Sequence, residues 1–416
     1  MADRATSTDP AVQAQLDRLA LLSPGADILG LDRMSALLDR LGNPERALPP
    51  VLHVAGTNGK GSTCAFLRAA IEAAGLTAHV YTSPHLVRFN ERIRLAGRLI
   101  EDGPLAALLT ETLDSAAGME LSFFEATTAA AFLAFARRPA DACIVEVGLG
   151  GRLDATNVIA TPLVCGIADL GHDHHAFLGD RLEQIAAEKA GIAKPGVPLV
   201  TQAYPEAIAH IVGRIAAEAG APWFEIGETD RDLWQVVDSV LQRELGGAHQ
   251  RRNAALAVAM IRRQAVLDVP DAALRAGLAQ ASWPARLQRL ESGPLRDLLP
   301  AGAELWLDGA HNPAAAGAVA AFFAGEKRPL HLVVGLLANK DARGVLEPFR
   351  ARAGSIQAVP VPGHEHHSAK ALNAAPARDV ADALRAIPPA GPPVVLIMGS
   401  LYLAGEVLEA NGQPPG

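Results

Sequence analysis

The stretch that decides the fold of this chain is Val51-Leu-His-Val-Ala-Gly-Thr-Asn-Gly-Lys-Gly-Ser-Thr63. Residues 51–55 form an apolar, strand-like run, and residues 64–74 have the periodicity and residue types of a helix. The turn between them holds three glycines, Gly56, Gly59 and Gly61. Backbone N–H groups of such a turn and the positive end of the following helix face a bound phosphate, and Lys60 adds a full charge. The sequence therefore predicts an ATP site at this turn.

The turn departs from the usual phosphate loop in one respect. The usual pattern places Ser or Thr directly after the lysine. Here Gly61 intervenes, and the hydroxyls follow at Ser62 and Thr63. The alternative is a glycine–lysine turn that binds no ligand, and the strand before it and the helix after it make that alternative the weaker one.

The amino-acid composition limits which classes of partner and which cellular location we expect for this protein. The formal net charge is −8 with no block of basic residues, so no nucleic-acid surface is indicated. The longest apolar stretch, residues 126–136, is too short to span a bilayer, and residues 1–7 lack the apolar core of a signal peptide. The three cysteines show no CxxC spacing, which favours reduced thiols and a cytoplasmic location.

Strand and helix patterns alternate along the first part of the chain. Residues 51–55, 79–81, 143–147, 163–167 and 198–201 read as short buried strands, with helical segments such as 127–135 and 182–190 between them. This alternation predicts an α/β fold with a parallel sheet covered on both faces. Ligands bind at the carboxyl ends of such strands. The polar motifs at residues 57–62, 83–85, 148–157 and 172–175 all follow strands.

A chain of 416 residues is long enough for two domains, because single cores stop growing near about 250–300 residues. A second α/β unit begins near residue 292, with strands expected at 304–307, 331–335, 356–359 and 393–397. Helices are expected at 313–323, 344–351 and 376–387, and two of them open on a proline. We predict an N-terminal domain of residues 1–285 and a C-terminal domain of residues 286–416. The linker lies at about 282–291, where Pro284 interrupts any helix.

Three side chains outside the glycine turn are candidates for chemistry. Glu146 lies near the end of a buried strand, where a carboxylate suits magnesium, although an arginine partner would also satisfy it. His174 has the right type for a second metal ion, although a loop histidine is more often solvated. Lys189 ends an apolar helical segment. It is either a snorkelling lysine or one whose depressed pKa lets it react with carbon dioxide.

Seven motifs in order resemble one known family: HVAGTNGKGST, TSPHLVRFNERI, FFEATTAAAF, EVGLGGRLDATN, DHHAFLGD, EKAGIAK and DGAHNP. The chain is similar, from residue 27 to residue 402, to the folylpolyglutamate synthase and dihydrofolate synthase family of the Mur-ligase superfamily, in its bifunctional bacterial type. Several spaced motifs are more specific than any single one. The resemblance implies a Mur-ligase-like fold, in which a P-loop parallel-sheet ATPase domain that also binds the pterin precedes a smaller Rossmann-like α/β domain.

The resemblance also implies roles for single residues. Those matching the ATP contacts are Thr57, Asn58, Gly59, Lys60, Gly61, Ser62, Asn253, Arg286 and Asp308, with His311 as a weaker candidate. Those matching the pterin-substrate contacts are Asp27, Ile28, Leu29, Ser122, Phe123, Phe124, Glu125, Leu153, Asp154 and Ala155. The ligands of a first magnesium ion match Ser83 and Glu146, and those of a second match His174 and an N-carboxylated Lys189. Lys60, Lys189 and His174 are then the catalytic candidates.

Two departures from the family pattern bear on these assignments. The loop at residues 169–175 has more spacer residues than the common form, so His172, His174 or His175 could be the metal ligand, with the Asp-His pair favouring His174. The linker reads Pro-Ala-Arg where Pro-Gly-Arg is expected, which changes backbone freedom but keeps the guanidinium of Arg286.

The implied activity is an ATP-dependent ligation of L-glutamate to dihydropteroate and to tetrahydrofolates through an acyl phosphate. The resemblance implies a monomer with two Mg²⁺ ions, and a K⁺ requirement stays open. The alternatives are folylpolyglutamate synthesis alone, another Mur-type amino-acid ligase, an NTP-dependent kinase or switch protein, and an inactive folate-binding protein. Only about 50 residues precede the glycine turn, too few for the extra domain of a nucleotide-sugar ligase.

Overall fold

The chain divides into two compact units in a computed structural model that describes residues 5–22, 29–173, 175–179, 181–241, 247–388 and 391–416. The division near the linker falls between Ser282 and Trp283, and the short segment His85–Val87 groups with the second unit. The boundary predicted from the sequence lies three residues further on.

The first unit is built around a sheet that has eight strands in the described residues, in the order β4-β3-β2-β5-β1-β6-β7-β8. Its strands are β1 (Val51–Ala55), β2 (Ala78–Tyr81), β3 (Ile93–Leu95), β4 (Arg98–Leu99), β5 (Ala142–Glu146), β6 (Val164–Ile167), β7 (Leu199–Thr201) and β8 (Trp223–Glu225). The neighbouring strands in the run β2-β5-β1-β6-β7-β8 all pair in parallel. Strands β3 and β4 add an antiparallel edge next to β2. The predicted parallel sheet is confirmed. The edge strands β3, β4 and β8 were not predicted.

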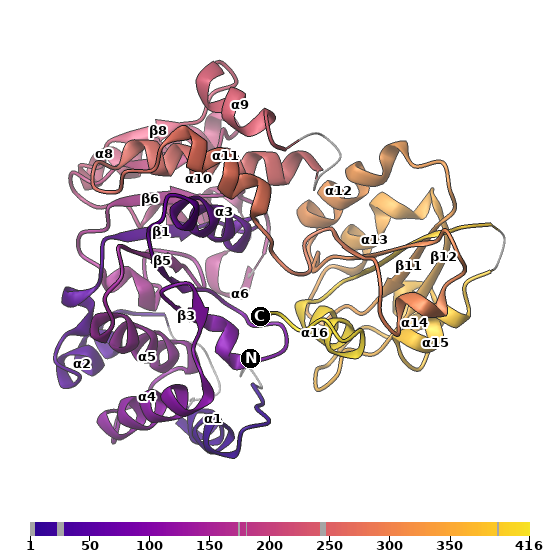
Figure 1. Ribbon diagram of the computed structural model, residues 1–416, viewed down its shortest axis with the longest axis horizontal. Coiled ribbons are helices and arrows are strands. Elements are labelled where there is room, and N and C mark those ends of the chain that lie inside the picture. The colour runs from indigo at the N-terminus through magenta and orange to yellow at the C-terminus, as the bar shows by residue number, and fades with distance from the viewer. Residues whose placement is uncertain (1–4, 23–28, 174, 180, 242–246, 389–390) are drawn as a thin grey trace. The chain divides into compact units, whose positions relative to one another are not determined.

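Helices cover both faces of this sheet, because alternate strand residues point to opposite sides. Val51 and Cys143 pack in one core with α1 (Pro10–Leu22), α2 (Asp32–Arg40), α4 (Asp102–Ser115) and α5 (Phe123–Arg137). Leu52 and Ile144 pack in another with α3 (Lys60–Ala73), α9 (Arg231–Asp238), α10 (Gly247–Arg263) and α11 (Asp271–Gln280). Figure 1 shows α3, α10 and α11 on one side of the sheet and α1, α4 and α5 on the other.

The described part of the first unit also has a third core and several short helices. A third core joins β6 and β7 to α7 (Leu182–Ala190) and α8 (Glu206–Ala219). The short helices are α6 (His175–Leu178) and the 3-10 turns η1 (Pro44–Ala47), η2 (Phe89–Arg92) and η3 (Ala155–Val158).

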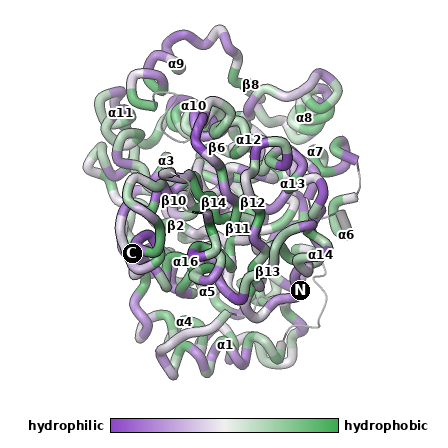
Figure 2. The backbone as a smooth tube through the Cα atoms, turned by 90° about the vertical axis from the view of Figure 1, so that its right-hand side faces the viewer, coloured by the Kyte–Doolittle hydropathy of each residue, from purple (hydrophilic) through white to green (hydrophobic). Residues whose placement is uncertain are grey.

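The second unit contains a six-stranded sheet in its described residues, ordered β13-β12-β11-β14-β10-β9. Its strands are β9 (Gln288–Leu290), β10 (Glu304–Leu307), β11 (Leu330–Val334), β12 (Ala353–Ala358), β13 (Ala375–Pro376) and β14 (Val394–Met398). Only β9 runs antiparallel among these described strands. The central strands β11 and β14 are buried along their whole length, and apart from His331 they consist of apolar residues (Figure 2).

Helices again cover both faces of the second sheet. One core contains α12 (Pro313–Phe322), α13 (Ala342–Arg350) and α14 (Ala369–Leu372), and the other contains α15 (Val380–Arg385) and α16 (Leu401–Ala410). The 3-10 turns are η4 (Arg296–Leu298) and η5 (Phe323–Gly325). The prediction of a helix at residues 376–387 is wrong at its start, because Pro376 lies in β13 and the helix begins at Val380. The carboxylate of Asp379 caps this helix by accepting the N–H of Asp382 at 2.7 Å, which sets the start.

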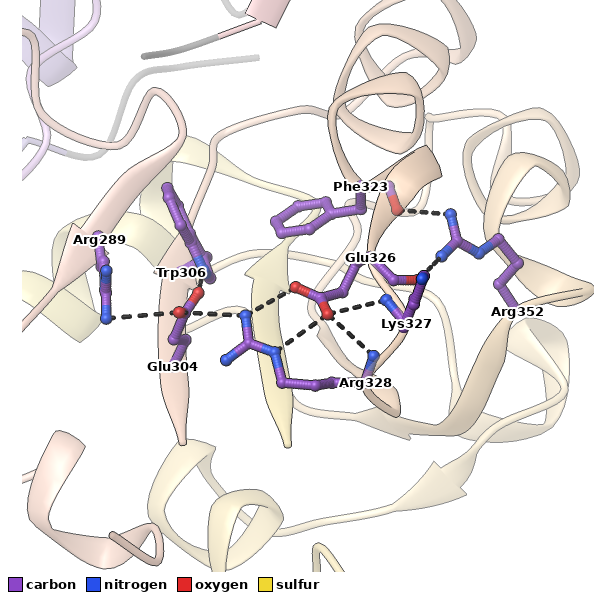
Figure 3. A network of polar contacts seen from close by, with 8 residues as sticks. All are labelled: Arg289, Glu304, Trp306, Phe323, Glu326, Lys327, Arg328 and Arg352. Carbon is purple, nitrogen blue, oxygen red and sulfur yellow. Dashed lines mark hydrogen bonds and ion pairs between the residues drawn. The ribbon is translucent and has the colours of Figure 1, made fainter. Parts of the chain in front are cut away.

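A network of ion pairs holds the edge of this sheet (Figure 3). Glu304 on β10 pairs with Arg289 on β9 at 3.4 Å and with Arg328, just before β11, at 3.1 Å. Arg328 also pairs with Glu326 at 2.7 Å. The guanidinium of Arg352 donates to two backbone carbonyls in the turn at residues 323–326. The network therefore fixes the turn that leads into β11, far along the chain from the candidate site residues of the first unit.

Candidate nucleotide and metal site

The glycine turn has the backbone that a phosphate loop requires. Gly59 has φ +82° and precedes α3, which begins at Lys60. Gly56 has φ +150°, and a Cβ there would lie 2.9 Å from the Cβ of Ala168. Among the described side chains none caps the start of α3, so its first N–H groups and positive dipole end are available to an anion.

Two lysines converge on this turn. The Nζ of Lys60 donates to the carbonyl oxygens of Gly56 at 3.0 Å and Thr57 at 3.3 Å, and the Nζ of Lys189 donates to the same Gly56 oxygen at 2.9 Å. Lys189 is only 4% exposed. Burial, reinforced by the nearby charge of Lys60, lowers the pKa of Lys189 to about 7. Two ammonium groups on one carbonyl repel each other, and an anion between them relieves that repulsion.

The loop after β6 lies alongside the glycine turn. The carbonyl of Asp169 accepts the N–H groups of Thr57 at 2.8 Å and Asn58 at 3.2 Å, and its carboxylate accepts the side-chain amide of Asn58 at 3.3 Å. The hydroxyl of Thr57 donates to the carbonyl of Gly171 at 3.0 Å. These bonds bring the loop at residues 169–175 next to the glycine turn, as expected for two loops that follow the neighbouring parallel strands β6 and β1. His172 is exposed, His174 lies outside the described residues, and His175 begins α6, so the choice among the three stays a prediction.

The two expected ligands of a first metal ion lie together. Glu146 ends β5 next to β1 and is 4% exposed, and its Oε2 accepts the N–H of Ser83 at 3.3 Å. A buried carboxylate beside a serine is an all-oxygen donor set of the kind that Mg²⁺ prefers. The residues present therefore fit a magnesium ion at this position.

The second metal position that the sequence predicts would depend on a modification of Lys189. Within the described part of the chain, no group of three or more His, Cys, Asp or Glu side chains is assembled to hold a metal. An amine nitrogen is a poor ligand for Mg²⁺, whereas the carbamate formed from a neutral amine and carbon dioxide offers two oxygens. The lowered pKa of Lys189 makes the neutral amine accessible near pH 7. The donor set thus fits only in the carbamate form.

The loop at residues 148–157 supports the end of α7, which carries Lys189. The N–H of Arg152 donates to the carbonyl of Glu188 at 2.8 Å, and the two side chains pair at 2.7 Å. Gly151 is pressed against α7: a Cβ there would lie 2.7 Å from the Glu188 oxygen and 3.0 Å from the Cα of Lys189. This position therefore requires glycine for a close approach rather than for its dihedral angles.

A buried chain of hydrogen bonds anchors that loop to β1. Asp154 accepts the N–H of Leu149 at 2.8 Å through Oδ2, and its Oδ1 accepts the N–H of Thr156 at 3.0 Å and the Thr156 hydroxyl at 2.5 Å. The Nε2 of His53 lies 2.8 Å from the same hydroxyl. Because the hydroxyl donates to Asp154, His53 must be the donor to Thr156. Burial, with a contribution from Lys194, lowers the pKa of His53 to about 3, so the ring is neutral at pH 7.

Sequence reasoning missed His53 as a site-supporting residue. The signal was present: a histidine in an otherwise apolar strand, two residues before the end of β1. Its Nδ1 is buried and has no hydrogen-bond partner among the described residues. Such a group destabilises the fold by about 1–3 kcal/mol, so an imidazole here is explained by its bond to Thr156 rather than by packing.

Comparison with known proteins identifies the family. No protein-family model matches the chain. The dihydrofolate synthase/folylpolyglutamate synthase of Bacillus subtilis (strain 168) is 39% identical over 313 residues, which cover 68% of this chain and 69% of that protein. The chain belongs to the dihydrofolate synthase and folylpolyglutamate synthase family.

Solved structures agree with this membership. A structure described as E. coli FolC in complex with DHPP and ADP is 29% identical, covers 97% of each chain and superposes with a TM-score of 0.82. A bifunctional folylpolyglutamate synthase/dihydrofolate synthase with Mn, AMPPNP and L-glutamate bound is 32% identical over 97% of this chain and 99% of its own, with a TM-score of 0.82. The chain is thus an ATP-dependent ligase, and the predicted Mur-ligase-like α/β fold is confirmed.

The residues expected to contact the pterin in this ligase have clear structural partners. Ser122 and Glu125 form a capping box at the start of α5, with the two side chains accepting each other's N–H at 3.1 and 2.7 Å, and Glu125 pairs with Arg33 at 3.0 Å. Phe123 packs edge-on against Phe89, and Phe124 covers Gly148. Leu29 and Leu153 are half-buried, Ala155 is buried, and Asp27 and Ile28 lie outside the described residues. Their contacts with substrate stay a prediction.

Arg286 and Asp308, the nucleotide candidates of the second unit, lie at the carboxyl end of β10. Asp308 accepts the N–H groups of Leu287 at 2.7 Å and Ala310 at 2.8 Å, and burial raises its pKa although Arg286 opposes this shift. The guanidinium of Arg286 donates to the carbonyl of Ala285 at 2.9 Å. Ala285 itself has φ +56°, a conformation that favours glycine, so the Pro-Ala-Arg sequence keeps the turn of Pro-Gly-Arg at some conformational cost.

None of the helices in the described residues has the length and apolar character that a membrane span requires.

Proposed function

We propose that this ligase joins L-glutamate to dihydropteroate and, in a second activity, to tetrahydrofolates. The observation that carries the proposal is the convergence of Lys60 and Lys189 on the carbonyl of Gly56, within the loop that precedes α3. A kinase or switch protein needs one lysine at its phosphates. A second, buried lysine whose carbamate would supply metal ligands fits a ligase that must neutralise ATP, an acid substrate and glutamate together.

The reaction follows from charge neutralisation. The carboxylate of the pterin substrate attacks the γ-phosphorus of ATP, which gives an acyl phosphate and ADP. The α-amino nitrogen of glutamate attacks the acyl carbon, phosphate leaves, and an amide remains. Lys60 and the N–H groups at the start of α3 bind the phosphates and stabilise the charge that develops on them. Arg286 and Asp308 are proposed as further nucleotide contacts.

The proposed metal ligands are Ser83 and Glu146 for a first Mg²⁺ ion, and the carbamate of Lys189 with His174 for a second. When bound, these ions act as Lewis acids that draw electron density from the phosphoryl oxygens. The E. coli relative in complex with DHPP and ADP, and the relative with Mn, AMPPNP and L-glutamate bound, support a nucleotide, a divalent metal ion and glutamate as ligands. We further propose a cytoplasmic monomer.

The test measures ADP release with dihydropteroate, in the presence and absence of L-glutamate, and the product masses. Glutamate-dependent ADP release with addition of one glutamate to dihydropteroate is expected, followed by extension of tetrahydrofolate. Extension of tetrahydrofolate without any dihydropteroate product would reduce the function to folylpolyglutamate synthesis. ADP release that requires neither dihydropteroate nor tetrahydrofolate would point to another class of ligase.

Lys60→Ala provides the residue-level check. Loss of the phosphate-binding ammonium is expected to lower turnover by about 10²–10³-fold, with an unchanged unfolding transition. Lys327→Ala, in an exposed turn of the second unit, is the matched control and keeps wild-type turnover. Near-normal turnover of Lys60→Ala would contradict the mechanism.

A further inference from the structure

Four buried polar side chains form a continuous chain between β7 and the phosphate loop. The side-chain amide of Gln202, just after β7, donates to Oδ1 of Asn253 at 3.2 Å. The amide of Asn253 donates to Oε1 of Gln250, also at 3.2 Å, and the amide of Gln250 donates to the hydroxyl oxygen of Ser62 at 3.2 Å. Asn253 and Gln250 lie on α10, and Ser62 is the third residue of α3.

The chain is shielded from solvent at every member. The exposed fractions are 4% for Gln202, 3% for Asn253, 7% for Gln250 and 2% for Ser62. Water therefore cannot replace a lost partner easily, and each amide depends on the orientation of its neighbours. Sequence reasoning named Asn253 and Ser62 as nucleotide contacts, but it gave no role to Gln202 or Gln250.

The direction of the chain determines what the Ser62 hydroxyl can do. An amide has a donor end and an acceptor end, so the chain has two self-consistent directions. In the observed one, Ser62 accepts from Gln250 and keeps its own proton to donate. The neighbouring hydroxyl of Thr63 is already used, because it donates to the carbonyl of Gly59 at 2.9 Å. No hydrogen bond from the Ser62 hydroxyl is made to any described residue.

The side-chain amide of Asn253 packs against Gly59 of the phosphate loop. The missing side chain of Gly59 leaves the space that Oδ1 of Asn253 occupies, because a Cβ at Gly59 would collide with that oxygen. In the direction of the chain given by the hydrogen bonds, the oxygen end of this amide lies against Gly59 and the nitrogen end faces Gln250.

We propose that Gln250, held by Asn253 and Gln202, is a positioning residue that turns the Ser62 hydroxyl proton toward the polyphosphate of the nucleotide. The inference rests on the nucleotide site within the proposed function and adds a residue to it. In the reversed direction Ser62 would donate to Gln250 and offer the anion only lone pairs, which repel it. Anion binding and the observed direction of the chain therefore stabilise each other.

The experiment measures the binding of a non-hydrolysable ATP analogue with Mg²⁺ by calorimetry, with no pterin or glutamate present. Gln250→Met has a similar side-chain length but no amide, and it should weaken binding about threefold to tenfold. Ser62→Ala should weaken binding by at least as much. The double variant should bind within about twofold of Ser62→Ala, because Gln250 acts through that hydroxyl.

The control is Gln264→Met, in the turn after α10, where the amide nitrogen donates to the carbonyls of Ile261 and Leu267 and the amide oxygen accepts the N–H groups of Val266 and Leu267. It should lower the unfolding temperature without changing nucleotide binding. If Gln250→Met fails to fold, Gln202→Met takes its place and should weaken binding about twofold or more, but not in the Ser62→Ala background. Wild-type nucleotide affinity of Gln250→Met, or of Gln202→Met where it takes its place, would overturn the proposal. So would a double variant whose loss of affinity is the product of the losses in the two single variants.

The same measurements separate this inference from the proposed function. Nucleotide binding does not depend on the acyl acceptor, so a loss of binding in Gln250→Met would stand even if no glutamate ligation were found. Conversely, ligation by the wild type with unchanged binding in Gln250→Met would refute only the role of Gln250. In steady-state assays the KM for ATP should rise in this variant, while the KM values for dihydropteroate and glutamate stay within about twofold.

Discussion

Replacing Thr156 with valine removes one hydroxyl from the buried chain that joins β1 to the loop at residues 148–157. That hydroxyl accepts from His53 Nε2 at 2.8 Å and donates to Asp154 Oδ1 at 2.5 Å. Valine has nearly the same shape, so packing is preserved while two buried groups each lose a partner. The Nε2–H of His53 is left without an acceptor, which costs about 1–3 kcal/mol, whereas Asp154 Oδ1 keeps the N–H of residue 156 and loses one hydrogen bond worth about 0.5–1.5 kcal/mol. The expected loss in the free energy of unfolding is therefore about 1.5–4.5 kcal/mol.

The assay is urea unfolding at pH 7.5, followed by circular dichroism, for Thr156→Val and for Thr156→Ser. Serine keeps both hydrogen bonds and loses one methyl group, so its cost should be about 1 kcal/mol. Turnover should fall only in the valine variant, because the anchored loop supports the end of α7 through the bond from Arg152 to Glu188. A valine variant within about 0.5 kcal/mol of the serine variant would refute the assignment of this chain as a structural anchor.

Three further predictions concern the same region. Lys189→Ala should lose activity, measured as ADP release, and should regain part of it when a short carboxylic acid such as acetate is added. Lys194→Ala, the control, should show no such rescue. Full activity of Lys189→Ala without added acid would exclude the carbamate. The pKa of His53 is about 3 in the folded state and 6.5 in the unfolded state, so the unfolded state binds the proton first and stability falls as pH drops below about 6.5. Urea unfolding at pH 7.5 and 5.5 should show an extra loss of about 1.4 kcal/mol in the wild type relative to His53→Gln, and equal slopes would contradict the shift. Gly59→Ala should weaken the binding of an ATP analogue, and it should lower the free energy of unfolding more than Gly75→Ala does. Both glycines have φ near +80°, but only Gly59 faces Asn253. Equal effects of the two substitutions would mean that backbone strain alone is responsible.

Local patterns predicted most of the elements that position the site. The phosphate loop, β5 with Glu146, and α7 with Lys189 were placed by hydrophobic periodicity and turn residues, which act over a few positions. Pro376 was misplaced because proline suits both a first helical turn and an edge strand, and the competing cap at Asp379 decided the helix start. The short strands β3, β4 and β8 carry too few residues for a periodic signal.

The sequence by itself determined the alternating α/β order and the family, because these follow from short-range patterns and from motifs in order. Only the tertiary structure decided which distant side chains share a hydrogen bond. His53 and Thr156 are 103 residues apart, Lys189 and Gly56 are 133 apart, and Gln250 and Ser62 are 188 apart. Parallel strands bring such residues to the same edge of a sheet, but the register of the strands and the packing of α10 against α3 fix which atoms meet. Those contacts depend on the whole folded unit, and no local pattern encodes them.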